Sequence, residues 1–284
     1  MLPHRRLALL TYATPDYLAQ QRAIIGSVRR AGFTDVFAWD RPRLEQTDFY
    51  AQHRHLLDRR KGGGLWLWKP YLINLELQRL APGDFLVYSD CGYPWRPLVI
   101  RQSLEPLLHW CATENGGVLP GVYVPKHGPN RKWTKHECFI AMQCDSARYW
   151  RHPQVQATFS VWQKCALAEE FVAEWLRWCI QPIALSDDRL MSAVREYPDF
   201  VDHRHDQSVL TNLVLMRGIR CFGHPDEVHP DTKYIDNLTD RIARRPVRIF
   251  ARKLSRRIVN ESRKQWLKLK RYAEETRRVN HPKG

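Results

Sequence analysis

Short apolar runs alternate with longer amphipathic stretches in the first part of the chain. Residues 7–12 and 35–39 are apolar enough to predict two strands, and residues 15–31 between them have helical character that ends at Gly32. Glycine is common just past the C-terminus of a helix. The order strand, helix, strand with a short turn is that of a βαβ unit, so we expect these two strands to pair in parallel.

A third strand is predicted at residues 85–88, which are apolar throughout and follow the turn Pro82-Gly83-Asp84. A fully apolar run of this length is typical of a strand that is buried on both faces. Apolar periodicity and flanking residues predict helices at residues 65–80, 98–112, 165–179 and 208–217, and residues 59–64 are predicted to form a loop. We therefore expect one α/β domain over residues 1–238, with a mixed, mostly parallel sheet flanked by helices.

The remaining residues, 239–284, have a different character. From Asp240 onward there are 16 Lys and Arg against 4 Asp and Glu, whereas the other 239 residues hold 29 against 26. The net charge is thus +12 in this tail and only +3 in the body. Val247, Phe250, Leu254 and Ile258 fall on one face of a helix that Pro246 could open, which is typical of a basic amphipathic element at an anionic membrane surface. A helix packed on its own domain and a nucleic-acid-binding tail are the alternatives.

Composition narrows the classes of protein further. No run of eighteen apolar residues is present, and the apolar stretch 7–10 is too short for the core of a signal peptide. Seven cysteines are scattered without CxxC spacing, which favours reduced, buried thiols over disulfides or a zinc site. We expect a cytoplasmic protein, peripheral at the inner face of the membrane. The near-neutral body argues against nucleic acid as a partner.

Asp90 is the first candidate for chemistry. It follows the predicted buried strand 85–88, and ligands of open α/β sheets bind at the carboxyl ends of the strands. Gly92 lets the backbone approach a bulky ligand. A carboxylate here could hold a divalent cation, Mn²⁺ or Mg²⁺, which would in turn hold a diphosphate. The alternative is an aspartate that caps a turn or helix.

Further candidates lie in two polar segments. His205, Asp206 and Gln207 precede the helical run at 208–217, and a helix N-terminus attracts anions, although Asp206 could instead be a simple N-cap. Trp133, with the neighbouring Thr134 and Lys135, offers an aromatic ring and hydrogen-bond donors suited to an acceptor sugar. A basic loop with a half-buried tryptophan is the alternative.

Lys69 is unusual because it lies within an otherwise apolar segment, residues 65–72. A buried lysine needs a partner, so we expect either a phosphate or a carboxylate such as Asp90 beside it. The glycines at 62–64 match neither a GxxxxGK[ST] nor a GxGxxG motif. His224 and His229 could be metal ligands or ordinary loop histidines.

Together these segments resemble a family. The matching pieces occur in a fixed order: GxWxWKP at residues 64–70, YSDCG at 88–92, Trp133-Thr134-Lys135, and HRHDQS at 203–208. This series is similar to bacterial glycosyltransferases of capsule and lipopolysaccharide synthesis, with the GT-A nucleotide-diphospho-sugar transferase fold, and it spans residues 7 to 230.

The resemblance implies roles for the matching residues. Thr11 and Tyr12 would lie near the nucleotide base, and Ser89 and Asp90 near the ribose and metal, with Asp90 as the first acid of a DxD motif. The second acidic position is Gly92, so His224 or His229 is the candidate to complete the metal site. Lys69 would neutralise the diphosphate, while Gln207 would hold the donor sugar.

The predicted reaction moves a sugar from a nucleotide-diphosphate donor to a saccharide or lipid-linked acceptor. The leaving diphosphate requires a positive charge, and an inverting enzyme requires a base, for which Asp206 or His205 is the candidate. In a retaining enzyme the carboxylate would steady an oxocarbenium charge instead. A nucleotide-sugar hydrolase or a nucleotidyltransferase on a similar sheet is the main alternative, and a non-enzymatic nucleic-acid-binding protein is the other.

Overall fold

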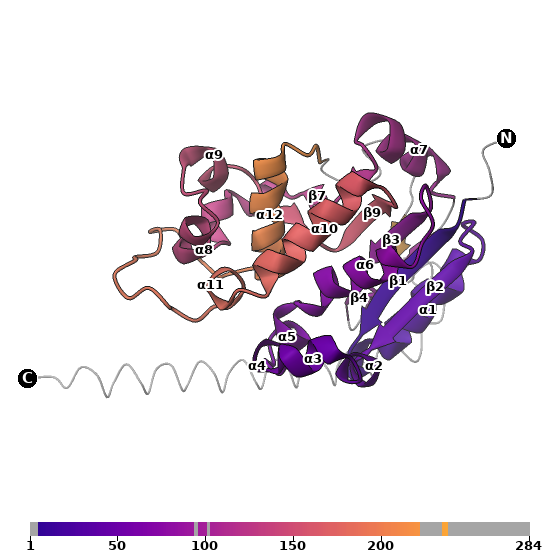
Figure 1. The fold of residues 1–284 in the computed structure, drawn as a ribbon, viewed down its shortest axis with the longest axis horizontal. Helices are drawn as coiled ribbons and strands as arrows, with labels where there is room; N and C mark the ends of the chain where they lie inside the picture. Colours follow the sequence, from indigo (N-terminus) through magenta and orange to yellow (C-terminus); the bar gives the residue numbers. More distant parts are fainter. Residues whose placement is uncertain (1–4, 94–95, 101–102, 222–234, 238–284) are drawn as a thin grey trace, which may run out of the picture. The chain divides into compact units, whose positions relative to one another are not determined.

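The computed structural model describes residues 5–93, 96–100, 103–221 and 235–237. At the centre of this part of the chain is a five-stranded mixed sheet with the order β2-β1-β3-β9-β6 (Figure 1). Its strands are β1 (Leu7–Ala13), β2 (Asp35–Asp40), β3 (Phe85–Ser89), β6 (Val118–Leu119) and β9 (Phe159–Gln163). Smaller strand pairs lie outside it: β4 (Gly92–Tyr93) with β5 (Arg96–Ile100), β5 with β10 (Ile235–Asn237), and β7 (Val122–Tyr123) with β8 (Val155–Gln156).

Strand β1 pairs in parallel with both β2 and β3, which confirms the predicted βαβ unit. The other two pairings, β3 with β9 and β6 with β9, are antiparallel. The expected mixed sheet flanked by helices is thus confirmed, with two parallel and two antiparallel pairings in place of a parallel majority.

Helices cover both faces of the sheet, as the alternation along β1 requires. Leu9 packs in one core with Ile24 and Leu107, whereas Leu10 packs in the other with Ile73 and Phe171. Thus α1 and α7 lie on one face, and α6 and α10 on the other. The helices are α1 (Leu18–Val28), α2 (Arg41–Glu45), α3 (Asp48–Gln52), α4 (Arg54–Leu57), α5 (Gly62–Leu65), α6 (Trp68–Gln78), α7 (Glu105–Glu114), α8 (His136–Ala141), α9 (Ala147–Trp150), α10 (Ala166–Cys179), α11 (Pro182–Leu185) and α12 (Asp206–Arg217), with the 3₁₀ turns η1 (Pro15–Tyr17), η2 (Pro125–His127) and η3 (Asn130–Lys132).

Two predicted helices differ from the structure. The segment 98–112 is not one helix: residues 98–100 belong to β5, and α7 begins only at Glu105. A short apolar run fits a strand and a buried helix equally well, so the pattern alone could not separate them. The helix predicted from residue 65 begins at Trp68, because the backbone before it turns in the opposite hand.

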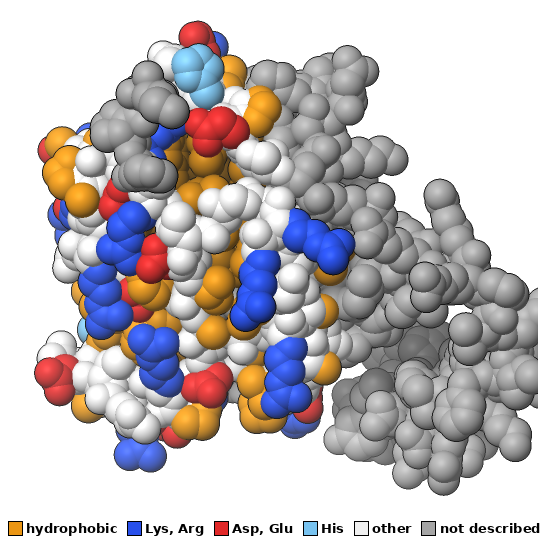
Figure 2. Space-filling model, turned by 90° about the vertical axis from the view of Figure 1, so that its right-hand side faces the viewer, with side chains coloured by type: hydrophobic (Ala, Val, Ile, Leu, Met, Phe, Trp, Pro, Cys, Tyr) orange, Lys and Arg blue, Asp and Glu red, His pale blue; other side chains and the backbone are white. Residues whose placement is uncertain are grey.

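Six of the seven cysteines are buried, as the sequence predicts for thiols that pack as small apolar side chains. Within the described ranges, no helix has both the length and the apolar character needed to cross a membrane. On the face drawn in Figure 2, Lys and Arg side chains are interspersed with Asp and Glu. The predicted amphipathic tail, residues 239–284, lies outside the described residues.

Candidate active site

The candidate site lies where the chain reverses its direction across the sheet. The connection from β1 to β2 runs through α1 on one face, and the connection from β2 to β3 runs through α6 on the other. In the order β2-β1-β3 the crevice between β1 and β3 is therefore a topological switch point, where open α/β sheets bind ligands. Asp16 and Tyr17 follow the end of β1 at this edge, and Asp90 and Cys91 follow the end of β3.

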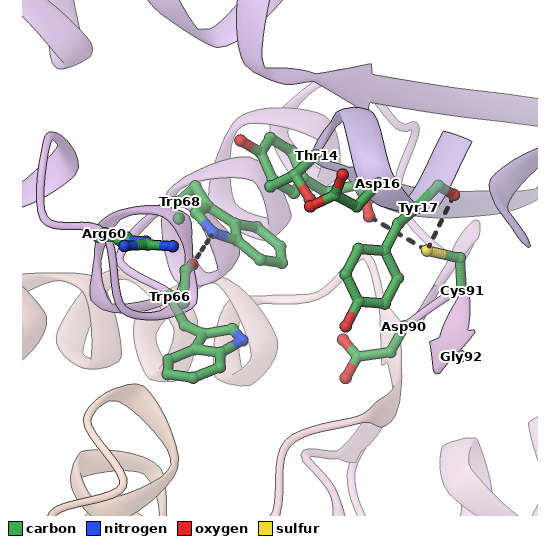
Figure 3. A pocket seen from close by; sticks show the side chains of 12 residues that line it. Thr14, Asp16, Tyr17, Arg60, Trp66, Trp68, Asp90, Cys91 and Gly92 are labelled. Carbon is green, nitrogen blue, oxygen red and sulfur yellow. Dashed lines mark hydrogen bonds between the residues drawn. The ribbon is translucent and has the colours of Figure 1, made fainter. Parts of the chain in front are cut away.

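A pocket of about 510 Å³ opens at this crevice. That volume is within the range of sites for small molecules and cofactors. In Figure 3 the indole rings of Trp66 and Trp68 lie in the middle of the pocket, Arg60 lies to one side, and Tyr17 and Asp90 to the other. Its walls are formed by Tyr12, Thr14, Asp16, Tyr17, Arg60, Gly62, Gly63, Trp66, Trp68, Asp90, Cys91 and Gly92. The surface offered to a ligand thus combines aromatic rings with two carboxylates and one guanidinium group.

Behind the pocket, Lys69 joins the two predicted acidic residues. Its Nζ lies 3.6 Å from Oδ1 of Asp90 and 3.3 Å from Oδ2 of Asp206, and it donates a hydrogen bond of 2.9 Å to the carbonyl oxygen of Ala157. The carboxylate partner expected for this buried lysine is therefore present twice. Lys69 and Asp206 are almost fully buried, whereas the Asp90 side chain is 29% exposed. Of the three, Asp90 is the residue that lines the pocket.

The protonation states follow from burial and charge. Burial lowers the pKa of Lys69, but the charges of Asp206 and Asp90 outweigh it and leave the pKa above that of a free lysine. Burial raises the pKa of Asp206 to about 6, against the opposing effect of Lys69. Asp206 Oδ2 accepts no hydrogen bond from the described residues, although Lys69 is close. A carboxylate held in this way is poised to gain or lose a proton near neutral pH.

Tyr88 and Tyr12 complete the surroundings of this cluster. The hydroxyl of buried Tyr88 donates to Asp90 Oδ1, and burial keeps the pKa of Tyr88 well above its ordinary value. The ring of Tyr12 stacks on that of Trp68, with centroids 4.0 Å apart and an interplanar angle of 21°. Tyr12 lines the pocket, whereas Thr11 and Ser89 are fully buried and do not. The Oγ of Ser89 donates to the carbonyl oxygen of Asp90 at 2.9 Å.

The wall that carries Trp66 has an unusual backbone. The five residues Gly62 to Trp66 all have positive φ, between 54° and 109°, so that α5 is a short left-handed turn. Non-glycine residues adopt this conformation at a cost of about 1–2 kcal/mol each, which applies here to Leu65 and Trp66. Glycine is required at Gly64, where a Cβ would lie 2.7 Å from the carbonyl oxygen of Leu57. This turn projects Trp66 into the pocket.

His205 lies directly behind Trp66, with ring centroids 5.6 Å apart. It also has a positive φ of 51° and is the residue that precedes α12. Its Nδ1 lies 2.9 Å from the carbonyl oxygen of Leu185, so Nδ1 carries the proton and the buried Nε2 is left as an acceptor without a partner among the described residues. Burial lowers the pKa of His205, which makes the imidazole neutral. The role of His205 as a base remains a prediction.

A buried network centred on Gln154 holds the beginning of α12. Gln154 Nε2 donates to Asn130 Oδ1 and Thr134 Oγ1 at 3.1 and 3.2 Å, and its Oε1 accepts from Gln207 Nε2 at 2.6 Å. Gln207 Oε1 in turn accepts from the backbone N–H of Ala157 at 3.4 Å. Thr134 and Gln207 are thus bonded to the protein, and neither is among the residues that line the pocket. Their roles toward acceptor and donor remain predictions.

Trp133 and Lys135 also have partners within the protein. The Arg204 guanidinium lies 4.5 Å from the centroid of the Trp133 ring. Lys135 Nζ lies 3.2 Å from Glu137 Oε2, in a pair whose side chains are both almost fully buried. Of the predicted site residues, the structure therefore brings together Tyr12, Asp90, Lys69, Asp206 and His205. Half-buried Trp133 and buried Thr134 and Lys135 do not line the pocket.

Of the residues predicted to bind a metal ion, Asp90 lines the pocket. His224 and His229 lie outside the described residues, and within the described part no three His, Cys, Asp or Glu side chains form a group able to hold a metal ion. Asp16, Tyr17, Arg60 and Trp66 line the pocket but were not predicted from the sequence. Trp66 lies inside the GxWxWKP piece, where the aromatic residues were available as a signal, whereas Arg60 was one cation in a basic loop.

No protein family and no curated protein sequence matches the chain. Among solved structures, the WbbM bifunctional glycosyltransferase in its apo form is similar over 80% of this chain, with 12% sequence identity and a TM-score of 0.42. The chain corresponds to only 40% of that protein's length.

Proposed function

We propose that this protein is a glycosyltransferase that moves a sugar from a nucleotide-diphosphate donor to a saccharide or lipid-linked acceptor. The observation that carries the proposal is the position of Asp90. It is a partly exposed carboxylate at the end of β3, at the switch point of the sheet and beside a pocket rich in aromatic rings. Buried Lys69 lies beside this carboxylate and compensates its negative charge. The ordered motifs that resemble capsule and lipopolysaccharide glycosyltransferases point to the same class.

Different residues of the pocket suit different parts of a nucleotide sugar. Exposed faces and edges of aromatic rings such as Trp66 suit a base or a sugar ring, which stack on flat apolar surfaces. For a divalent cation, Asp90 fits as a single protein carboxylate, because Mg²⁺ in such sites is often bound by one or two carboxylates together with substrate phosphates. The cation would supply positive charge for the leaving diphosphate.

The buried residues would act on Asp90 rather than on the substrate. Lys69 and the Tyr88 hydroxyl both face Oδ1 of Asp90, which fixes the orientation of its carboxylate. Asp206 is buried and does not line the pocket, so we assign it a positioning role through Lys69. A direct role of Asp206 as base would require the side chain to reach the pocket.

Donor turnover tests the proposal. The full-length protein would be incubated with UDP-, GDP-, ADP-, CDP- and TDP-sugars, with and without Mn²⁺, and with saccharide and lipid-linked acceptors. We expect one donor class to be consumed with transfer to an acceptor, and Asp90→Asn to lower that turnover at least tenfold. Asp58→Asn, at a partly exposed aspartate that does not line the pocket, is the matched control. Donor cleavage to free sugar, unchanged by any acceptor, would identify a hydrolase instead.

The proposal extends to where the enzyme works. The +12 charge of residues 240–284 would attract anionic lipids at the cytoplasmic face of the membrane, where lipid-linked acceptors are available. Flotation with vesicles that contain phosphatidylglycerol tests this part. We expect the full chain to float with the vesicles at low salt and residues 1–238 alone to remain unbound. Equal flotation of the two proteins would refute membrane attachment by the tail.

A further inference from the structure

Three consecutive cationic residues, Arg59, Arg60 and Lys61, precede the left-handed turn at the wall of the pocket. Only Arg60 among them is a pocket-lining residue. Its side chain is exposed, and it forms no ion pair with any described residue. It is also the single Lys or Arg found among the described residues that line the pocket.

The residues on either side of Arg60 are held by carboxylates of the segment between α11 and α12. Arg59 pairs with Asp188, while Lys61 Nζ lies 2.8 Å from Asp202 Oδ1 and 3.3 Å from Asp187 Oδ2. Such partly exposed pairs each contribute little to stability, about 1 kcal/mol or less. Their effect is to direct two cations of the triplet away from the pocket and to fix the segment between them.

The backbone at Arg60 is fixed as well. Its carbonyl oxygen accepts a hydrogen bond of 3.2 Å from the N–H of Gly63, which is the beginning of the left-handed turn. Figure 3 shows Arg60 on the side of the pocket away from Asp90, with the indoles of Trp66 and Trp68 between them. A ligand that stacks on these indoles would therefore meet a guanidinium group on one side and a carboxylate on the other.

Lys69, the other cation near the pocket, does not line it, because its Nζ points toward oxygens of the protein interior. The Nζ of Lys69 is already surrounded by three oxygens, from Ala157, Asp206 and Asp90, and its side chain is 4% exposed. The role of neutralising a phosphate in this pocket, which the sequence suggested for Lys69, is left to a residue at the surface.

We infer that Arg60 binds a phosphate group in this pocket, and that the ion pairs of Arg59 and Lys61 hold Arg60 in position. A guanidinium group presents paired N–H donors that match two oxygens of a phosphate. The inference deepens the proposed function and rests on it for the source of the phosphate. That source is either the donor diphosphate or the phosphate of a lipid-linked acceptor, and the two share the same chemistry.

Calorimetric titration of the full-length protein with inorganic pyrophosphate, UDP and GDP tests the inference, and uridine and guanosine serve as uncharged probes. We expect Arg60→Ala to weaken pyrophosphate binding about tenfold to a hundredfold, the range for a hydrogen bond between charged groups, and to leave nucleoside binding unchanged. Arg60→Lys should restore part of the affinity, because it keeps the charge but not the paired donors. The control is Arg54→Ala, which removes an exposed arginine that does not line the pocket.

The outcomes separate this inference from the proposed function. Equal pyrophosphate affinity in wild type and Arg60→Ala, or no phosphate binding by the wild type, overturns the inference even if sugar transfer is found. Loss of pyrophosphate binding in Arg60→Ala alone supports it even if no sugar is transferred. In an active enzyme, a raised KM for the donor identifies the donor diphosphate as the source, and a raised KM for the acceptor alone identifies the acceptor phosphate.

The ion pair between Lys61 and Asp202 can be tested separately. Asp202→Ala releases Lys61 without removing any residue that lines the pocket, so we expect a smaller loss of pyrophosphate affinity than in Arg60→Ala. Asp202→Glu should restore the affinity, because its carboxylate can still reach Lys61. Full affinity in Asp202→Ala would show that Arg60 binds phosphate without help from this ion pair.

Discussion

Lys69 and Asp206 form an ion pair inside the protein, with 3.3 Å between Nζ and Oδ2, and both side chains are 4% exposed. The pair crosses from the first turn of α6 to the first residue of α12. It therefore links the N-terminal half of the domain to the helix that begins within the HRHDQS motif. Charges this deeply buried are stable only together, because each would otherwise lack a compensating partner.

Removal of the cation from this pair should be costly. We expect Lys69→Met to lower the free energy of unfolding by about 3–5 kcal/mol, since it leaves Asp206 and Asp90 without their shared counter-charge. Urea denaturation followed by circular dichroism measures the change. Lys61→Met removes a partly exposed lysine that also has two carboxylate partners and should cost about 1 kcal/mol or less. Equal losses in the two variants would contradict this account of the buried pair.

The titration of Asp206 should contribute to the pH dependence of the free energy of unfolding. Its pKa of about 6 in the folded protein lies above the ordinary value of 3.8, because burial disfavours its charged form. Between these two pH values the folded state binds more protons than the unfolded state, so this residue's contribution to stability decreases as the pH rises from about 4 to 6.

Comparison of the wild type with Asp206→Asn isolates this effect from other titrating groups. The free energy of unfolding of the wild type relative to the variant should fall across pH 4 to 6 and become constant above about pH 7. Urea denaturation of both proteins at half-unit intervals gives the curve. A difference that stays constant through this window would mean that Lys69 keeps Asp206 ionised throughout.

The sequence predicted more of the fold than of the site. The apolar run 85–88 follows a turn and predicted a buried strand, and a lysine at position 69 inside an apolar segment predicted a phosphate or a carboxylate beside it, with Asp90 as the candidate that the structure confirms. The division of 98–112 into β5 and α7 did not follow, because it depends on pairing with other strands. Asp206 lies behind the pocket and Arg60 lies at its wall because of the way distant segments pack. Neither position can be predicted from the local sequence pattern.

We expect the left-handed turn before α6 to require glycine at position 64. Gly64→Ala places a Cβ 2.7 Å from the Leu57 carbonyl oxygen at a φ of 109°, so both steric conflict and backbone strain oppose it. We expect a loss of about 2–5 kcal/mol in unfolding free energy and weakened pyrophosphate binding, because the turn positions the pocket wall.

Gly218→Ala is the matched control for this substitution. Gly218 also has a positive φ, of 64°, but its Cβ would meet no atom within 4 Å, and the residue lies at the end of α12. Backbone strain alone should cost about 1–2 kcal/mol there and leave ligand binding unchanged. If the two variants lose stability equally and bind pyrophosphate alike, the turn has no special role in the pocket.

The hydrogen bond from Tyr88 to Asp90 should matter more for turnover than for stability. Tyr88→Phe removes a hydroxyl group whose acceptor, Asp90, is partly exposed and can be solvated instead, so a cost of only about 0.5–1.5 kcal/mol is expected. Because the carboxylate of Asp90 then loses one of the two groups that fix its orientation, kcat should fall about tenfold with little change in KM. Tyr197→Phe removes a comparable hydroxyl that donates to Asp145 at 2.8 Å and does not line the pocket. This control should lose similar stability and keep its kcat, and a Tyr88→Phe enzyme with wild-type kcat would remove Tyr88 from the proposed site.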